Sequence, residues 1–266
     1  MAIKSMQHQK IISLVPSITL LLFDLGLDTQ IVGRTKFCIH PKEKINSIPT
    51  IGGTKNSDIQ KINQLQPDII FAAKEENEKE IIEQLKKDFK VIVFDIKNLD
   101  DNYKMIAKIG KLTQTAQKAQ EIIETTKQNF EKLKTTFSPS LSLPNNIETL
   151  YLIWRKPYMT IGKDTFIHAM LEQLGLKNIF AHQTRYPIIQ NLQTSYFSKC
   201  QLVLLSSEPY PFTQQHIKEI QEQLPNAKIL LVDGEYFSWY GSKIKDAPSY
   251  FEKLLEKILE KTKELL

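Results

Sequence analysis

Short runs of apolar residues alternate with stretches of helical periodicity along this chain, and the order of these segments occurs twice. The first pass covers residues 11–99 and the second covers residues 149–233. The runs are rich in β-branched residues and predict buried parallel strands, whereas apolar positions three or four residues apart predict helices between them. The pattern predicts an α/β fold of two similar, Rossmann-like lobes with mainly parallel sheets and a ligand cleft between the lobes.

Polar residues and prolines mark where several of these helices begin. The pair Pro16-Ser17 stops the first apolar run, and Ser17 is expected to cap a helix. Ser57-Asp58 opens another helix in the same way. Helix N-termini at Ser17 and Asp164 would direct backbone N–H groups toward an anionic ligand. Residues 249–266 predict a final amphipathic helix packed on the second lobe.

A different pattern separates the two lobes. Residues 102–136 contain almost no turn residues, and their apolar positions recur at steps of mostly three, four or seven. This spacing predicts one long amphipathic helix of about 50 Å at a rise of about 1.5 Å per residue. A rigid rod of this kind would limit the relative motion of the lobes. The expected organisation is an N-terminal lobe at 1–100, a connecting helix at 101–137 and a C-terminal lobe at 138–266.

Composition narrows the classes of function without choosing among them. The chain has 266 residues, 41% of them hydrophobic and 24% charged, as in ordinary globular proteins. Its 35 basic and 30 acidic residues form no basic stripe, so no nucleic-acid partner is expected. The polar first ten residues predict no signal peptide, which leaves a cytoplasmic location open. Cys38 and Cys200 fall in different lobes, and no disulfide is expected between them.

Aromatic and basic side chains gather in the segments that follow the predicted strands. Parallel sheets bind ligands at the carboxyl ends of their strands, where these segments lie. Aromatic rings bury a large flat ligand at little entropic cost and arginines bind anionic groups, so the pattern indicates a bulky anionic or amphipathic ligand. Packing of many of the rings beneath loops is the alternative. The candidate ligand-binding residues are Pro16, Ser17, Arg34, Lys36, Phe37, Gly53, Thr54, Trp154, Arg155, Tyr158, Arg185, Tyr186, Glu208, Tyr210, Phe237 and Trp239.

The sequence offers little for catalysis or for a metal site. It contains no GxSxG elbow, no GxxxxGK[ST] loop and no GxGxxG fingerprint, so no catalytic residue is assigned and no enzyme is expected. Cys38 and His40 are the closest pair of soft ligands, but a closed zinc site needs about four such groups. No metal-ligating residue and no intrinsic cofactor are therefore expected. His40 with Glu208 is the pair that could serve a chelatase.

An acidic run at residues 74–80 stands where a helix is predicted to begin. Carboxylates near a helix N-terminus interact favourably with the helix dipole, so a solvated helix start accounts for the run. A docking patch for a partner protein is the alternative, with Glu78 and Glu80 as its candidate residues.

Five segments of the first lobe occur in an order that is fairly specific to one family. They are IISLVPS at 11–17, LFDLG at 22–26, IVGRT at 31–35, IGG at 51–53 and LQPDII at 65–70. Together they resemble the cobalamin and ferric-siderophore class of solute-binding proteins of ABC transporters. The resemblance implies two lobes joined by one long backbone helix, modest closure and a periplasmic or otherwise extracytoplasmic location. It also implies capture of a bulky metal chelate, either a corrinoid or a ferric siderophore or haem-like molecule, for an ABC permease.

The chain departs from the cobalamin-binding members of that class at three places. Ala73 stands where those members place a tryptophan in the first lobe, and Tyr186-Pro187 aligns with their second tryptophan. Such relatives dock on the permease through one surface glutamate in each lobe. Glu78 or Glu80 matches this position in the first lobe, whereas residues 191–193 of the second lobe lack an acid. A monomer is expected. The alternative function is an intracellular tetrapyrrole or corrinoid carrier, or a chelatase-like enzyme on the same scaffold.

Overall fold

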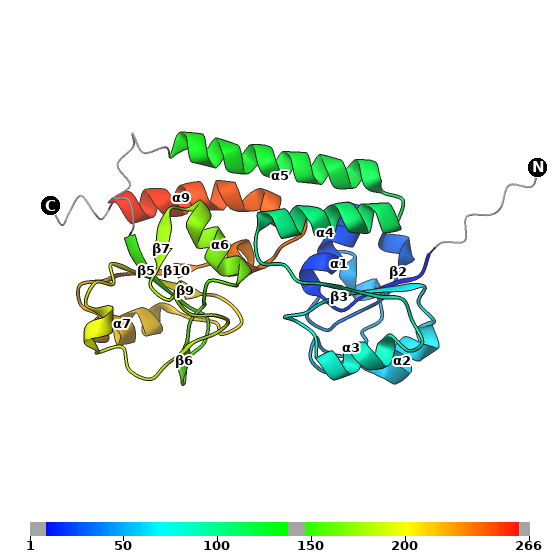
Figure 1. Ribbon diagram of the computed structural model, residues 1–266, viewed down its shortest axis with the longest axis horizontal. Helices are drawn as coiled ribbons and strands as arrows, with labels where there is room; N and C mark the ends of the chain where they lie inside the picture. Colours follow the sequence, from blue (N-terminus) through cyan, green and yellow to red (C-terminus); the bar gives the residue numbers. More distant parts are fainter. Residues whose placement is uncertain (1–8, 138–146, 261–266) are drawn as a thin grey trace, which may run out of the picture. The chain divides into compact units, whose positions relative to one another are not determined.

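The computed structural model describes residues 9–137 and 147–260, and it divides into two compact units (Figure 1). Unit 1 comprises the described parts of residues 1–96 together with 100–123 and 240–243. Unit 2 comprises residues 97–99, the described parts of 124–239, and 244–260. The division differs from the expected boundaries, because residues 240–243 belong to unit 1 although most of unit 2 precedes them in the chain.

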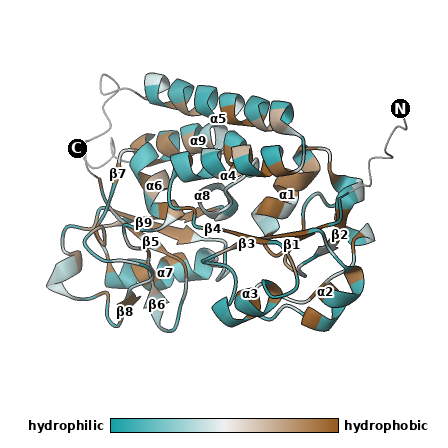
Figure 2. Ribbon diagram, turned by 45° about the vertical axis from the view of Figure 1, so that its right-hand side comes forward, coloured by the Kyte–Doolittle hydropathy of each residue, from teal (hydrophilic) through white to brown (hydrophobic). Residues whose placement is uncertain are grey.

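The unit 1 sheet contains four parallel strands in the order β2-β1-β3-β4. Figure 2 shows that the strands are largely hydrophobic, and all five residues of β3 are buried. Strands buried on both faces read as continuous apolar runs, which is why the sequence pattern located them. The elements are β1 Ile11–Ser13, α1 Pro16–Asp24, β2 Ile31–Arg34, α2 Ile59–Leu65, β3 Ile69–Ala73, α3 Lys79–Leu85, β4 Val91–Phe94 and α4 Leu99–Leu112, with 3₁₀ turns at Asp28–Gln30 and Ile45–Ser47.

The unit 2 sheet has the same design, with four parallel strands in the order β10-β9-β5-β7. A small antiparallel pair, β6 and β8, lies outside it. The elements are β5 Ile147–Leu152, β6 Tyr158–Met159, α6 Phe166–Gln173, β7 Leu176–Asn178, β8 Ile188–Ile189, β9 Leu202–Ser206, α7 Gln214–Gln223, β10 Lys228–Val232, α8 Glu235–Ser238 and α9 Ala247–Glu260, with 3₁₀ turns at Ser195–Phe197 and Lys243–Asp246. The predicted fold class of two α/β lobes with parallel sheets is confirmed.

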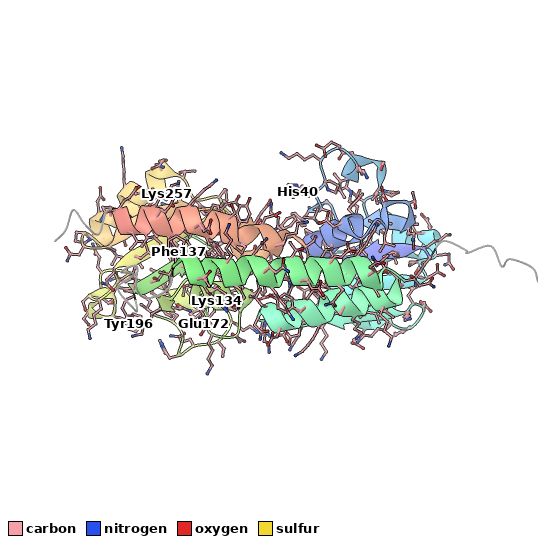
Figure 3. The ribbon with its side chains drawn as sticks, turned by 90° about the horizontal axis from the view of Figure 1, so that it is seen from above. His40, Lys134, Phe137, Glu172, Tyr196 and Lys257 are labelled. Atoms are coloured by element: carbon pink, nitrogen blue, oxygen red, sulfur yellow. The ribbon has the colours of Figure 1, made fainter. Side chains whose placement is uncertain are left out.

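The prediction of one unbroken helix over residues 102–136 is wrong. The interval contains α4 and a second helix, α5 (Ala116–Thr136), which run side by side in Figures 1 and 3. Between them Gln114 adopts a left-handed conformation with φ 59°, which ends α4. Gly110 then lies so close to Ala119 that a Cβ on the glycine would overlap the alanine Cβ. The chain therefore reverses direction here, and α5 passes from unit 1 into unit 2.

Helix starts follow the expected chemistry in part. Asp58 caps α2 by accepting from the Lys61 N–H at 3.1 Å, as predicted. Ser17 does not cap α1, because Val15 occupies the N-cap position and Pro16 begins the helix. Helix α6 is capped by Thr165 and not by Asp164.

The C-terminal helix α9 packs on unit 2, as expected for its described residues; residues 261–266 lie outside them. Figures 1 and 3 show it lying along the second half of α5. The rings of Phe130 on α5 and Phe251 on α9 meet edge to face, with centroids 6.5 Å apart. No helix within residues 9–137 and 147–260 combines the length and the apolar character that crossing a membrane requires.

Candidate functional site

The candidate residues of unit 2 follow strands that end at the same edge of its sheet. Strand β5 ends at Leu152 and is followed by Trp154, β9 ends at Ser206 and is followed by Glu208, and β10 ends at Val232. Because the strands are parallel, their carboxyl ends meet at one edge, the place where open α/β sheets bind ligands. We call this the carboxyl edge of unit 2.

Glu208 is the most tightly held acidic side chain at this edge. Its Oε1 accepts hydrogen bonds from Ser238 Oγ at 2.5 Å and from Trp239 Nε1 at 3.1 Å. The backbone around it is fixed as well, since Ser206 Oγ donates to the Glu208 carbonyl at 2.6 Å. Gly234 makes room for this arrangement, because a Cβ there would lie 2.6 Å from Glu208 Cγ. The carboxylate is therefore held in one orientation by two consecutive residues at the end of α8.

Burial controls the protonation of Glu208. Desolvation raises the pKa of this carboxyl above its usual value, and the nearby carboxylates of Glu235 and Asp233 raise it further. The hydrogen bonds from Ser238 and Trp239 stabilise the charged form and oppose that rise. Glu208 is thus a desolvated acceptor with no cation paired to it within the described residues.

Two predicted ligand contacts of this segment belong largely to the interior. Phe237 is fully buried, and its ring packs against Tyr151 and Phe251 with centroid separations of 5.1 and 4.9 Å. It is a core residue of this structure, whereas the sequence predicts a ligand contact here. Trp239 is only 8% exposed and lies against Glu208 through its ring nitrogen. Phe237 lies on the short helix α8, and it packs inward because this helix lies against Tyr151 of β5 and Phe251 of α9.

Trp154 is the exposed aromatic side chain of the carboxyl edge. It is 40% exposed on a hairpin in which it pairs with Met159, and its ring meets Tyr210 edge to face at 5.8 Å. Tyr210 is fixed in turn, since its hydroxyl lies 3.1 Å from His216 Nε2. A rigid aromatic surface with one face in solvent suits contact with a flat ligand.

Arg155 is engaged by a carboxylate of its own unit. Its Nε and Nη2 donate to the two carboxylate oxygens of Glu219 on α7, at 3.2 and 2.5 Å. The Tyr158 hydroxyl donates to the same carboxylate at 2.9 Å. These hydrogen bonds lower the pKa of Glu219 and raise that of Arg155, whereas burial is the main cause that raises the pKa of Tyr158. Arg155 and Tyr158, both predicted ligand contacts, are thus held together by the carboxylate of Glu219.

Arg185 is held in a similar way. Asp164 Oδ1 accepts the Arg185 backbone N–H at 2.5 Å, and Asp164 Oδ2 lies 3.4 Å from Arg185 Nε. The carboxylate that was expected at a helix N-terminus thus fixes the loop that leads to Tyr186. Tyr186 itself is half-buried and remains a candidate contact.

In unit 1, Arg34 is a structural residue. Only 8% of it is exposed, and its guanidinium donates to the carbonyls of Ile45, Thr35 and Cys38 at 3.1 to 3.3 Å. The loop that follows presents Phe37 instead, which is 50% exposed with the Lys36 ammonium 5.1 Å from its ring centre. Lys36 and Phe37 are thus the accessible members of this predicted group.

The remaining unit 1 candidates are organised by a residue that the sequence analysis missed. Asn77 is buried; its Oδ1 accepts the Ala73 N–H at 2.9 Å, and its Nδ2 donates to the carbonyls of Leu14 and Thr54. This amide joins the ends of β1 and β3 to the loop that holds Gly53 and Thr54. Pro16 and Thr54 are half-buried there, whereas Ser17 is only 4% exposed. No sequence signal separates Asn77 from the acidic run around it.

The acidic run and the cysteines complete the picture of unit 1. Glu78 precedes α3 and pairs with Lys55 at 3.5 Å, while Glu80 is exposed in the first turn. Cys38 is a buried thiol in contact with the hydroxyls of Thr19 and Thr35, and burial raises its pKa. Over residues 9–137 and 147–260, no group of three or more His, Cys, Asp or Glu side chains is arranged to hold a metal ion.

A shallow pocket of about 310 Å³ lies at the opposite edge of the unit 2 sheet. It is lined by residues that precede β9 and β10, among them Cys200 and Ala227. It shares no residue with the carboxyl edge and brings together no charged side chains, so we do not assign the ligand site to it.

Comparison with known proteins agrees with this geometry. A model of the family described as "Periplasmic binding protein" matches residues 11–223, which is most of the chain. The chain belongs to the periplasmic binding protein family. An uncharacterised ABC transporter substrate-binding lipoprotein of Bacillus subtilis is 30% identical over 186 residues, which cover 67% of this chain and 57% of that relative. The aligned part thus spans little more than half of the relative's length.

Solved structures of periplasmic binding proteins share the fold at low sequence identity. The periplasmic vitamin B12 binding protein of Vibrio cholerae has a TM-score of 0.78 at 19% identity, covering 94% of this chain and 97% of its own. A periplasmic haem binding protein from Pseudomonas aeruginosa has a TM-score of 0.79 at 16% identity, covering 93% and 92%. At these identities the likeness concerns the fold alone.

Proposed function

We propose that this chain is the substrate-binding protein of an ABC importer and that it captures a bulky metal chelate of the corrinoid, haem or ferric-siderophore type outside the cytoplasm. The observation that carries the proposal is the family match over residues 11–223. Relatives described as vitamin B12 binding and haem binding proteins share its fold. The family match gives no support to the alternative of an intracellular carrier or chelatase.

The carboxyl edge of unit 2 supplies the chemistry for such a ligand. Trp154 offers a rigid aromatic face in solvent, and Glu208 offers a fixed hydrogen-bond acceptor. In unit 1, Phe37 and Lys36 are exposed on the loop after β2. The chelate is held by ring contacts and hydrogen bonds at its periphery, and its metal arrives already coordinated. The chain acts as a monomer without enzymatic activity, and the partner that receives the ligand is an ABC permease, for which Glu78 and Glu80 are the candidate docking residues.

Tryptophan fluorescence tests the proposal directly, because the chain contains two tryptophans. Titration with dicyanocobinamide, haemin and ferrioxamine B should give saturable quenching by at least one ligand. In Trp154→Phe the fluorescence comes from the buried Trp239, and in Trp239→Phe it comes from the exposed Trp154, so the two variants show which tryptophan the ligand quenches. Trp154→Ala should weaken binding by about tenfold, since loss of one aromatic contact removes roughly 1.4 kcal/mol.

The matched control is Tyr196→Ala. Tyr196 is an exposed aromatic residue of the same unit, labelled in Figure 3, and its ring packs on Phe180 and Phe197 in the segments before β9. Its removal should leave the dissociation constant unchanged. A chain that binds none of the three ligands would refute the proposed function.

A further inference from the structure

We propose that the carboxyl edge of unit 2 selects chelates whose rim carries hydrogen-bond donors, above all carboxamides, and discriminates against chelates rimmed by carboxylates. The inference rests on the proposed function and names the chemical class of its ligand. It depends on three features of this edge: the orientation of Glu208, the pairing of the two nearby arginines, and the charges around Glu208.

Glu208 is built as an acceptor with one oxygen to spare. Oε1 is satisfied by Ser238 and Trp239, whereas Oε2 makes no hydrogen bond with the described residues and is not among the buried atoms that lack a partner. Oε2 is therefore unpaired and not fully buried, on a carboxylate whose orientation is already fixed. An acceptor whose orientation is already fixed can accept a hydrogen bond from a ligand N–H or O–H with little loss of side-chain entropy.

The arginines that could have bound a ligand carboxylate are occupied. Arg155 forms a bidentate pair with Glu219, and Arg185 pairs with Asp164. At Arg155, a ligand carboxylate would have to displace Glu219, which holds the same donors in good geometry. The exchange leaves Glu219 without its partner, so it yields little net attraction. Arg185 is held less firmly, by one contact of its Nε with Asp164 at 3.4 Å.

The charges around Glu208 act against an anion in the same way. Asp233 follows β10 directly, and its Oδ1 accepts the Glu235 N–H at 3.1 Å, which keeps both acids in the loop that faces Glu208. Burial is the main cause that raises the pKa of Glu208, and the charges of Glu235 and Asp233 raise it further. A ligand carboxylate placed at Oε2 would meet the same repulsion, whereas a neutral carboxamide would donate its N–H without it.

Two corrinoids with the same macrocycle separate these cases. Dicyanocobinamide carries carboxamide side chains, whereas dicyanocobyrinic acid carries carboxylates at the corresponding positions. The wild-type protein should bind the amide at least tenfold more tightly than the acid at pH 7. Haemin, which has two propionates, should rank with the acid, and ferrioxamine B, which has amide N–H groups and an ammonium, should rank with the amide.

Three variants test the residues. Glu208→Gln should reduce the preference for the amide at least fivefold, because the free position then presents an uncharged group. Glu219→Gln should strengthen binding of the acid severalfold, because Arg155 is released from its partner. Glu148→Gln is the control: it removes a carboxylate that pairs with Lys177 at the start of β5, at the other edge of the sheet, and should leave the ratio unchanged.

The outcomes distinguish this inference from the proposed function. Equal affinity for the two corrinoids, or tighter binding of the acid or of haemin, would overturn the selectivity and leave the binding function standing. An unchanged ratio in Glu208→Gln would overturn the role of Glu208. Failure of all four ligands to bind would overturn the proposed function, and the inference with it.

Discussion

Asn102 and Gly241 bind each other through both polar atoms of the asparagine amide. The Gly241 N–H donates to Asn102 Oδ1 at 2.6 Å, and Asn102 Nδ2 donates to the Gly241 carbonyl at 3.4 Å. Gly241 has a positive φ of 78°, and a Cβ there would lie 3.1 Å from the Ser17 carbonyl oxygen. The pair fixes the segment 240–243 within unit 1, although Gly241 lies 139 residues after Asn102 in the chain.

Asn102→Ala should destabilise unit 1 markedly. Asn102 is fully buried, so the substitution leaves the Gly241 N–H and carbonyl without partners in the interior. Unsatisfied buried groups of this kind cost about 1–3 kcal/mol each, and we expect the free energy of unfolding to fall by about 3 kcal/mol. Urea denaturation measures the change. Asn63→Ala, at an exposed position of α2, is the control and should lower it by less than about 0.5 kcal/mol.

The close approach of α4 and α5 predicts an unusual response to a helix-favouring substitution. Replacing glycine by alanine inside a helix ordinarily stabilises it by about 1 kcal/mol. At Gly110 the new methyl group would overlap Ala119, so Gly110→Ala should destabilise the protein by about 2 kcal/mol. Ala119→Gly in the same chain should recover part of the loss. A single variant Gly110→Ala that proves more stable than the wild type in thermal unfolding would contradict the hairpin contact.

The ion pair between Arg155 and Glu219 should stabilise unit 2 modestly and in a pH-dependent way. Both side chains are partly exposed, so we expect Glu219→Gln to lower stability by no more than about 1 kcal/mol at pH 7. The hydrogen bonds from Arg155 lower the pKa of Glu219 below its usual 4.5. The stabilisation is therefore present above about pH 4.5 and is lost as the pH falls through the lowered pKa. Melting temperatures of the two proteins between pH 3 and 7 should converge at the acidic end. A difference in melting temperature that increases toward pH 3 would contradict a stabilising ion pair between Arg155 and Glu219.

The fold could be predicted from the sequence because its signals are local. Buried parallel strands leave continuous apolar runs, and Asp58 before a helical pattern is a local cap. The break between α4 and α5 was not predicted, because a glutamine such as Gln114 rarely adopts a positive φ and, unlike glycine or proline, is not a helix-breaking signal in a sequence. Apolar spacing alone is the same for one long helix and for two helices that turn back on each other.

The site was harder to predict because its decisive contacts join distant residues. Arg155 and Glu219 are 64 positions apart, and no local sequence pattern around either residue predicts that they form an ion pair. Aromatic residues that follow strands are predicted to lie at the carboxyl edge of the sheet, yet Phe237 is buried in the core whereas Trp154 is exposed to solvent. Which ring faces outward depends on the helices that cover the loop, and those are tertiary contacts.

Glu208 should destabilise the folded protein at neutral pH, in keeping with a role in binding. Burial raises its pKa in the folded state above the usual 4.5. The folded state therefore holds this proton more strongly than the unfolded chain, and stability is lost as the pH rises from about 4.5 through the raised pKa. Glu208→Gln keeps an acceptor for Ser238 and Trp239 but has no charge to desolvate.

The variant should consequently melt at a higher temperature than the wild type at pH 7, and the difference should shrink toward pH 4. Ser238→Ala is the companion variant. It removes a hydrogen bond that lowers the pKa of Glu208, so the loss of stability with rising pH should become steeper. If the wild type and Glu208→Gln instead show the same pH dependence, Glu208 is not the desolvated carboxylate that its burial indicates. If Glu208→Gln is more stable than the wild type and less selective for its ligand, then the carboxylate at position 208 lowers stability and is needed for ligand recognition.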